Sequence, residues 1–397
     1  MVNEKEKIIY VYFNNGIDDI LMGRLYISNL RGKEIHAFEY DEKWLSDKKN
    51  NIFIDPNINF FAGRQWLSDM SNENNIFGVF EDSAPDRWGR LLLNRREELR
   101  AKNENRNARS LMSSDYLLGV SDFTRMGAIR FKFDVDGNFL DDSDIEVPPT
   151  TKLRDLEAAS LAFENEKNFE EYKILLEPGS SLGGARPKAN VIDESGNIYI
   201  AKFPSKNDEY DIGALEKQVY DLAKKCNLNV VDSYVMKFSK SGSTFLIKRF
   251  DRENENGKMK RIHFESAMAL LGKKDGDNST SYLDIASFIH SYGVNVKNDL
   301  KELFKRIAFN IIIKNTDDHL RNHGFLFKNG GWTLSPLYDV NYNKYGSHLH
   351  LLIDKNNSSL DTDILVETSK YYDIDKDTGK KIVDEINDIV NNEFYKK

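Results

Sequence analysis

Residues 315–326, NTDDHLRNHGFL, concentrate polar and ionisable side chains directly after one of the most apolar runs of the chain. Asp317 and Asn322 have the D-x-x-x-x-N spacing of a kinase catalytic loop, in which the aspartate accepts the proton of a substrate hydroxyl and the asparagine reaches a magnesium ion. His319 and His323 could instead bind zinc, although neither an H-E-x-x-H motif nor a clearly spaced third ligand accompanies them. The adjacent aspartates could also merely cap a turn. This stretch alone leaves the three interpretations open.

A further carboxylate, Asp339, lies in the segment LSPLYDVNY, seventeen residues after Asn322. A kinase-like fold places its other magnesium ligand, the aspartate of the D-F-G motif, at this distance beyond the catalytic loop. Taken alone, Asp339 is only an aspartate that follows an apolar, strand-like segment.

Phosphate-binding chemistry is indicated earlier in the chain, in SSLGGARPK, residues 180–188. Its paired glycines let the backbone approach an anion, so successive amides can point at phosphate oxygens, although a plain glycine turn has the same composition. Lys202, in the strand-like YIAKF, could neutralise phosphates or be a solvated lysine. Glu216, on the following helix, could orient Lys202 through an ion pair, as in protein kinases, or lie on the surface.

The order of these features is more specific than any one of them. A glycine loop is followed by a strand lysine, a helix glutamate, a second hairpin, the Asp-x4-Asn pair and a further aspartate. Chance would rarely produce all six features in this order, and a protein kinase has them in the same order along its chain. The chain is therefore expected to bind ATP and Mg²⁺.

Length and composition limit the other possibilities. A chain of 397 residues, 40% hydrophobic and 30% charged, is expected to fold as two or three globular domains. The net charge of -8 argues against a general nucleic-acid coat, although a local basic patch would be compatible with it. One cysteine, Cys226, excludes a disulfide framework and a cysteine-based zinc site. Without a signal-peptide layout or a membrane-length apolar run, we expect a cytoplasmic protein without a membrane partner.

Alternation and helical periodicity predict the elements that position these residues. In the first 145 residues, IIYVYF and GRLYIS alternate like a strand pair, GAIRFKF reads as another strand and a helix begins after Pro85. The acidic, proline-containing segment 141–151 reads as a linker.

In the middle of the chain, the residue pattern predicts a helix in TKLRDLEAASLAF, followed by two hairpins with a second helix between them. The first hairpin leads through DESGN into IYIAKF, and the second joins DSYVMKF to TFLIKRF. Between them, residues 212–226 carry apolar side chains at helical spacing. From about Arg261 onward the chain reads as mostly helical, and apolar positions in residues 300–312 follow the i, i+3, i+4, i+7 pattern straight into Asn315.

With these motifs in view, the chain resembles the HipA family, serine/threonine kinase toxins of bacterial type II toxin–antitoxin modules. The resemblance covers nearly the whole chain and is carried by FEDSAPDRWGRLLLNRR and DYLLGVSDFTRMGAIRF, then by SSLGGARPKA, FLIKRFDR, NTDDHLRNHGFL and LSPLYDV. It implies an α+β, protein-kinase-like fold with a mixed α/β N-terminal half and a mainly helical C-terminal lobe. The implied parts are residues 1–145, an ATP-binding region at 152–255 and a helical lobe with the catalytic loop at 256–397.

The resemblance also implies roles for individual residues. Asp317 matches the catalytic base, and Asn322 and Asp339 match the magnesium ligands. Ser181, with Ser180 as its alternative, matches the regulatory serine that is autophosphorylated. The implied ATP-binding residues are Gly183, Gly184, Ala185, Arg186 and Lys188 in the phosphate loop, Lys202 on the strand, Lys248, Arg249 and Phe250 in the segment whose backbone binds adenine, and His319 and Tyr338 in the nucleotide pocket.

The implied function is phosphorylation of a bacterial protein, such as an aminoacyl-tRNA synthetase, which arrests translation and growth. The implied partner is a small HipB-like helix-turn-helix antitoxin, through which alone the chain would reach operator DNA. Lys248 departs from the family pattern, which has an acidic residue there, but a contact made through backbone survives this change.

Two other classes of function compete with the kinase. The first is a catalytically silent kinase-like antitoxin, corepressor or scaffold, which has no need of the complete set Lys202, Asp317, Asn322 and Asp339. The second is a metal hydrolase that uses the Asp/His cluster. The kinase ranks above both.

Overall fold

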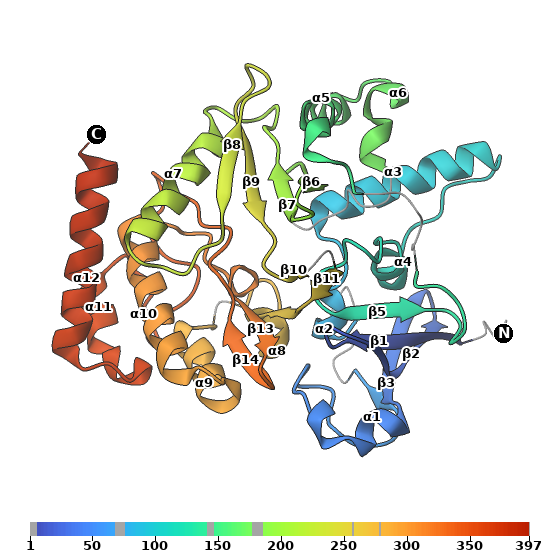
Figure 1. Ribbon diagram of the computed structural model, residues 1–397, viewed down its shortest axis with the longest axis horizontal. Coiled ribbons are helices and arrows are strands. Elements are labelled where there is room, and N and C mark those ends of the chain that lie inside the picture. The colour runs from blue at the N-terminus through green and yellow to red at the C-terminus, as the bar shows by residue number, and fades with distance from the viewer. Residues whose placement is uncertain are drawn as a thin grey trace. The chain divides into compact units, whose positions relative to one another are not determined.

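The computed structural model describes residues 6–67, 76–140, 147–176, 186–255, 258–277 and 279–396. The chain divides into two compact units, which are described separately (Figure 1). Unit 1 comprises Met1–Asp211 and Met236–His263, and unit 2 comprises Ile212–Val235 and Phe264–Lys397. The predicted parts 1–145 and 152–255 fall largely in unit 1 and the part 256–397 largely in unit 2, while their functional division stays a prediction.

Unit 1 begins with an antiparallel sheet in the order β4-β3-β2-β1-β5. Its central pair, β1 and β2, is the strand pair predicted from IIYVYF and GRLYIS, with Ile9 opposite Leu25 and a bulge at Val11/Tyr12. Ile9, Val11 and Phe13 are buried at alternate positions of β1, because successive side chains of a strand point to opposite faces, and Tyr12 between them is buried as well. The strands are β1 (Lys7–Asn14), β2 (Asp19–Leu30), β3 (Lys33–Tyr40), β4 (Gln65–Trp66) and β5 (Ile129–Lys132).

The helices of unit 1 include the one predicted after Pro85. This helix, α3, begins at Arg87 behind the N-cap Asp86 and buries Trp88, Leu92 and Leu93. The indole of Trp88 donates to the carbonyl of Lys188 at 2.9 Å and so ties α3 to the strand β6. The helices and 3-10 turns of unit 1 are α1 (Glu42–Ser46), η1 (Lys48–Asn50), α2 (Gly78–Glu81), α3 (Arg87–Asn103), α4 (Ser113–Leu118), η2 (Thr150–Lys152), α5 (Leu153–Glu164), α6 (Phe169–Tyr172) and η3 (Lys173–Leu176).

The predicted glycine-loop hairpin is present as β6 (Lys188–Ile192) and β7 (Ile198–Lys202), which turn at Gly196 with φ +80°. β7 also pairs with β9 (Thr244–Lys248). The strand predicted from DSYVMKF is β8 (Ser233–Met236). A further hairpin of β10 (Arg252–Glu255) and β11 (Lys258–Arg261) was not predicted, because its strands are short and mostly charged.

Unit 2 is mainly helical, as predicted, and α10 is its central helix. The stripe predicted in residues 300–312 is buried, and α10 packs against α9, α11, α12 and β14. Burial of each such Leu, Ile or Phe side chain contributes roughly 1.5–3 kcal/mol. The elements of unit 2 are α7 (Ile212–Lys225), β12 (His263–Ser266), α8 (Ala267–Leu270), α9 (Tyr282–Tyr292), α10 (Val296–Ile312), η4 (Leu320–Asn322), β13 (Gly324–Lys328), β14 (Gly331–Leu334), α11 (Thr362–Glu367), η5 (Ser369–Tyr372), α12 (Lys376–Val390) and the π-helical turn η6 (Asn391–Tyr395).

Three short strands interrupt the predicted helical region of unit 2. β13 and β14 form a hairpin whose turn residues Asn329 and Gly330 have φ values of 56° and 80°. Asn-Gly is the composition that such a turn requires, so the sequence did carry a signal for this hairpin.

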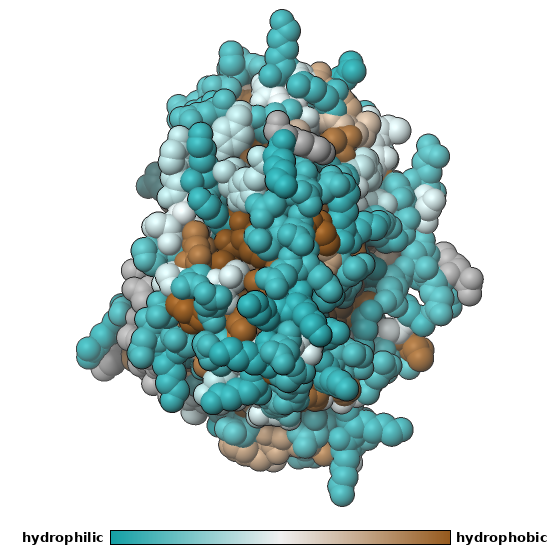
Figure 2. Space-filling model, turned by 90° about the vertical axis from the view of Figure 1, so that its left-hand side faces the viewer, coloured by the Kyte–Doolittle hydropathy of each residue, from teal (hydrophilic) through white to brown (hydrophobic). Residues whose placement is uncertain are grey.

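The surface over the C-terminal helices is mostly hydrophilic, with hydrophobic residues in small groups between polar ones (Figure 2). This agrees with helices that turn their apolar stripes to the core. Among the described residues, no helix has the length and apolar character that crossing a membrane requires.

Candidate active site

The stretch that begins at Asn315 forms an irregular loop between α10 and β13 in unit 2. α10 ends where Lys314 adopts a left-handed backbone with φ 56°. Beyond it, Asn315 and Asp318 are buried at 2% and 1% exposure, whereas the side chain of Asp317 is 66% exposed. The two adjacent aspartates therefore have opposite environments, and only Asp317 is open to a substrate.

Asp317 and Asn322, the predicted base and metal ligand, are brought together by the short turn η4. The Nδ2 of Asn322 donates to the carbonyl of Asp317 at 2.7 Å. This bond occupies the nitrogen of the carboxamide and leaves its oxygen as the acceptor atom that a cation would use. The Nε2 of His319 lies 3.4 Å from Oδ1 of Asp317, which places this predicted nucleotide-pocket residue beside the predicted base.

Asp318 is the centre of a buried hydrogen-bond network. Its carboxylate accepts from the hydroxyl of Tyr282 at 2.6 Å, from the amide of His350 at 2.5 Å and from the amide of Leu351 at 3.4 Å. Burial raises the pKa of Asp318 and outweighs these hydrogen bonds, which lower it. Asp318 is therefore a buried residue that holds the loop from within and is not solvated.

The segment that follows Asp339 lies beside the start of the same loop. The amide of Asn341 donates to Oδ1 of Asn315 at 3.4 Å. Asn343 donates from its amide to the carbonyl of Lys314 at 3.2 Å and from its Nδ2 to the hydroxyl of Thr316 at 2.8 Å. Three hydrogen bonds thus join residues 314–316 to residues 341–343, so the loops that carry Asp317 and Asp339 are anchored to each other.

Asp339 itself has an uncommon backbone conformation, with φ 52°. Its amide donates to the hydroxyl of Tyr220 on α7 at 3.0 Å. Tyr220 is fully buried, and burial followed by the negative charges of Glu216 and Asp339 raises its pKa well above the usual value. Glu216 is also buried, at 4% exposure, so its interpretation as a surface glutamate is wrong.

Tyr338, a predicted nucleotide-pocket residue, is fixed by two contacts. Its hydroxyl donates to the carbonyl of Arg321 at 2.6 Å, and its ring packs edge-on against Phe264. Gly324 lies under both rings, where a Cβ atom would come within 2.3 Å of Phe264 and 3.0 Å of the Tyr338 hydroxyl. The glycine of NHGFL is therefore needed for close packing.

His323, considered above as a zinc ligand, is buried, and burial lowers its pKa to about 3. Its ring packs edge-on against Tyr282, and neither ring nitrogen has a hydrogen-bond partner among the described residues. Within the described ranges, no group of three or more His, Cys, Asp or Glu side chains is arranged to hold a metal ion.

Several predicted ATP-binding residues lie in unit 1. Lys202 on β7 is directly opposite Lys188 on β6, and both are buried, so Lys202 is not the solvated lysine that its position alone allowed. The Nζ of Lys202 lies 5.8 Å from the centre of the Phe245 ring. Arg186 forms a two-pronged ion pair with Asp208 at 2.5–2.6 Å, which anchors the residues leading into β6.

The segment predicted to bind adenine begins at the end of β9. Lys248 is opposite Tyr199 on β7, and the amide of Arg249 donates to the carbonyl of Ile198 at 2.9 Å. The guanidinium of Arg249 is buried and donates to Asp251, to Asn190 and to the carbonyl of Thr124. The side chain of Arg249 therefore lies in the interior of unit 1, and Phe250 follows it beyond the end of β9. Ser180, Ser181, Gly183, Gly184 and Ala185 lie outside the described residues.

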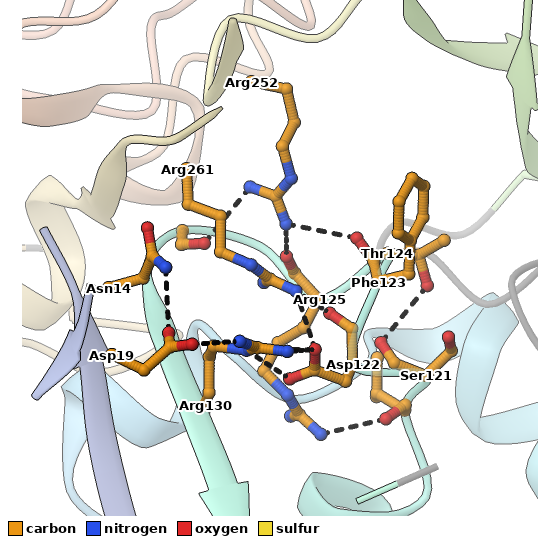
Figure 3. Close-up of polar contacts among 12 residues, drawn as sticks. Asn14, Asp19, Ser121, Asp122, Phe123, Thr124, Arg125, Arg130, Arg252 and Arg261 are labelled. Atoms are coloured by element: carbon orange, nitrogen blue, oxygen red, sulfur yellow. Dashed lines mark hydrogen bonds and ion pairs between the residues drawn. The ribbon is translucent and has the colours of Figure 1, made fainter. Parts of the chain in front are cut away.

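Unit 1 contains a buried cluster of arginines and aspartates that the sequence motifs did not predict (Figure 3). Asp122 accepts from Arg130 and Arg261, and Asp251 accepts from Arg249 and Arg252. These opposite charges outweigh burial and lower the pKa values of both aspartates. The only sequence signal is the recurrence of charged residues among apolar ones in SDFTRMGAIRF and IKRFDR.

Arg125, together with Arg252 of this cluster, holds residues 117–127 by their backbone carbonyls. Arg125 donates to the carbonyls of Leu117 and Val120, and Arg252 donates to those of Phe123 and Gly127. The cluster therefore joins this loop to β5, β10 and β11 within unit 1.

Comparison with known proteins agrees with this architecture. Residues 180–393, more than half of the chain, match the family model of the HipA-like C-terminal domain. A solved chain of the Shewanella oneidensis MR-1 HipA, HipB and operator DNA complex superposes on 98% of this chain and 90% of its own length, with a TM-score of 0.66 and 16% identity. At this identity the match concerns the fold.

Two curated relatives bear names of candidate kinases. One, from Haemophilus influenzae, is 29% identical over 192 residues, which cover 44% of this chain and 55% of the relative. The other, Y4mE of Sinorhizobium fredii, is 28% identical over 148 residues, or 36% of this chain and 33% of the relative. The chain thus spans about half of the first relative and a third of the second. With the family match and the superposition, these findings show that the chain belongs to the HipA family and has its kinase-like α+β fold.

Proposed function

We propose that this chain is a HipA-type serine/threonine protein kinase that transfers the γ-phosphate of ATP to a bacterial protein. One observation carries the proposal: Asp317 is exposed, its loop is folded back by Asn322, and the same loop is hydrogen-bonded to the segment that follows Asp339. A base and two oxygen ligands for a cation would then come from connected loops of one unit. This is the set that phosphoryl transfer requires.

In the proposed reaction, the substrate hydroxyl oxygen forms a bond to the γ-phosphorus while the bond from that phosphorus to the β–γ bridging oxygen breaks. ADP leaves, and the hydroxyl proton passes to the carboxylate of Asp317. The 66% exposure of the Asp317 side chain supports this role, because the base must reach a protein side chain in solution.

The residues present fit a magnesium ion. Asn322 and Asp339 offer carboxamide and carboxylate oxygens, the hard ligands that Mg²⁺ prefers, and a nucleotide supplies more of them through its phosphates. When bound, the ion neutralises charge on the phosphates. The bond from Asn322 to the Asp317 carbonyl supports this assignment, because it engages the carboxamide nitrogen and not the oxygen.

Nucleotide binding is proposed to use residues of unit 1 as well. Lys202 would neutralise the α and β phosphates, and Glu216 would orient it. Gly183, Gly184, Ala185, Arg186 and Lys188 would form the phosphate loop, while Lys248–Phe250, His319 and Tyr338 would enclose the base and sugar. The burial of Lys202 supports this set, since a buried lysine on an inner strand interacts strongly with an anion.

Regulation and partners are proposed from the family. Autophosphorylation of Ser181, or of Ser180, would add roughly -1.5 to -2 charges to a loop that receives phosphates and would oppose ATP binding. We further propose a protein substrate such as an aminoacyl-tRNA synthetase. The Shewanella protein was solved with HipB and operator DNA; for this chain, a helix-turn-helix antitoxin is the proposed partner and its link to DNA.

Asp317→Ala tests the proposal. With γ-labelled ATP, Mg²⁺ and a bacterial lysate, the wild type should label proteins on serine or threonine, and the variant should lose this label yet still bind MgATP. Asp384→Ala, at an exposed position of α12, is the matched control and should label as the wild type does. A wild type that binds MgATP but labels nothing would instead be a silent binding module.

A further inference from the structure

A series of buried polar side chains, each hydrogen-bonded to the next, adjoins the loop of the exposed Asp317. The Nδ2 of Asn315 donates to Oδ1 of Asn310 at 3.1 Å, and the Nδ2 of Asn310 donates to the hydroxyl of Tyr282 at 3.0 Å. The Tyr282 hydroxyl in turn donates to Asp318 at 2.6 Å. All four residues are buried, and they come from α9, α10 and the catalytic loop.

The direction of these hydrogen bonds favours an ionised carboxylate at position 318. Because the Tyr282 oxygen accepts from Asn310, its single proton is directed to Asp318. The other oxygen of Asp318 accepts from the amide of His350. Asp318 therefore faces donors on both sides, and the carboxamide of an asparagine, which has the same shape, would turn its own N–H groups toward one of them.

The two ends of this network lie on either side of the predicted base. Asn315 is two residues before Asp317, and Asp318 is the residue after it. Asn315 also accepts from the amide of Asn341, in the segment that follows Asp339. Burying a charge costs folding free energy, and holding one defined conformation is the best-attested use of such a group.

We propose that Asp318, Tyr282, Asn310 and Asn315 form a positioning network that fixes the loop of Asp317 against the segment of Asp339 for phosphoryl transfer. The inference rests on the proposed function for its kinetic consequences. None of the four is a catalytic residue, since each acts through the loops that it holds.

Asp318→Asn is the first test, with Asp299→Asn as a matched control. Asp299 is also a buried aspartate of unit 2 with its pKa raised by burial, and it accepts from Thr333 and from the amide of Leu334. Asp299 lies on α10 and joins it to β14, so Asp299→Asn should lower the melting temperature and leave kcat within about twofold. Asp318→Asn should lower kcat about tenfold or more, with little change in the KM for ATP.

The pH profile is a second readout, which a merely structural role would not move. The hydrogen bond from Tyr282 lowers the pKa of Asp318, so Tyr282→Phe should raise that pKa. Activity, which needs ionised Asp318, should then be lost at a higher pH on acidification than in the wild type. Ionisable groups around Asp318 and Tyr282 include His323 and Tyr372. Burial lowers the pKa of His323 to about 3 and raises the pKa of Tyr372 far above its usual value. The rings of His319 and His350 also lie nearby, and all four groups remain in the Tyr282→Phe variant.

Amide hydrogen exchange separates failure of this inference from failure of the kinase proposal. At pH 7 Asp318→Asn should speed exchange in residues 314–322 and 339–343, and Asp299→Asn should not, whether or not the chain transfers phosphate. Unchanged exchange in these segments would overturn the network as a positioning device. Two results together would overturn the role of the network in phosphoryl transfer. One is a wild-type kcat in Asp318→Asn, and the other is an unchanged pH of activity loss on acidification in Tyr282→Phe.

Discussion

At the scale of single residues, the site depends on different environments for neighbouring groups. Asp317 and Asp318 are adjacent and identical in type, yet one is exposed and the other is buried and fixed by three donors. Asp339 differs from both, because its backbone is in the left-handed region. Residue type alone therefore does not distinguish these aspartates, and the loop conformation does.

Asp339→Asn tests the proposed metal ligand without disturbing the backbone. Asparagine is among the residues that tolerate a left-handed φ, so the substitution removes the charge and keeps the conformation. We expect little change in the free energy of unfolding, within about 0.5 kcal/mol, and a rise of about tenfold or more in the Mg²⁺ concentration for half-maximal transfer. The measurement is a Mg²⁺ titration of the initial rate, and an unchanged titration midpoint would remove Asp339 from the metal site.

At the scale of elements, the arginine–aspartate cluster holds together parts of unit 1 that are far apart in sequence (Figure 3). Asp251 accepts from Arg249, Arg252 and the amide of Gly127, so it joins the end of β9, the start of β10 and the loop before β5. Removing one member of such a set leaves buried charges without their partner.

Asp251→Asn should therefore lower the free energy of unfolding by about 3–5 kcal/mol at pH 7. The folded-state pKa of Asp251 lies below its usual value, so its contribution is fully present above the unfolded pKa of about 3.9 and is lost as the pH falls toward the folded pKa. Urea unfolding at pH 7 and at pH 3 should show a smaller difference between variant and wild type at the lower pH. Asp134→Asn, at an exposed position, is the control, and an equal loss in both variants would argue against the cluster.

The sequence predicted those elements whose pattern is local. α3, α10 and the pairing of β1 with β2 were predicted because periodicity and caps lie within each segment. The β10–β11 hairpin was missed because its strands are short and mostly charged, and Arg252 and Arg261 on these strands also bond carbonyls more than 100 residues away. Likewise Asp317, Asn322 and Asp339 were predicted from spacing, whereas the bond from Tyr282 to Asp318 joins residues 36 apart and leaves no local signal.

At the scale of the whole molecule, the family model of the HipA-like C-terminal domain matches residues 180–393, and the likeness in fold to the Shewanella HipA structure covers nearly the whole chain. Its net charge of -8 opposes attraction to a polyanion.

The chain alone is therefore expected to bind DNA weakly. A labelled 30-base-pair duplex titrated with the protein, at about 150 mM salt, should show no anisotropy change at micromolar concentration, since specific contacts would come from a helix-turn-helix partner. Binding by the isolated chain in this range, weakened by added salt, would contradict the proposal that DNA is reached only through that partner.

The central claim is that this chain is a protein kinase that acts through Asp317. Its most direct test is a phosphoproteome of bacteria that express the wild type or Asp317→Ala at equal levels. We predict phosphoserine or phosphothreonine sites that arise with the wild type and are absent with the variant. The same set of sites in both strains, with both proteins folded and present, would contradict the account.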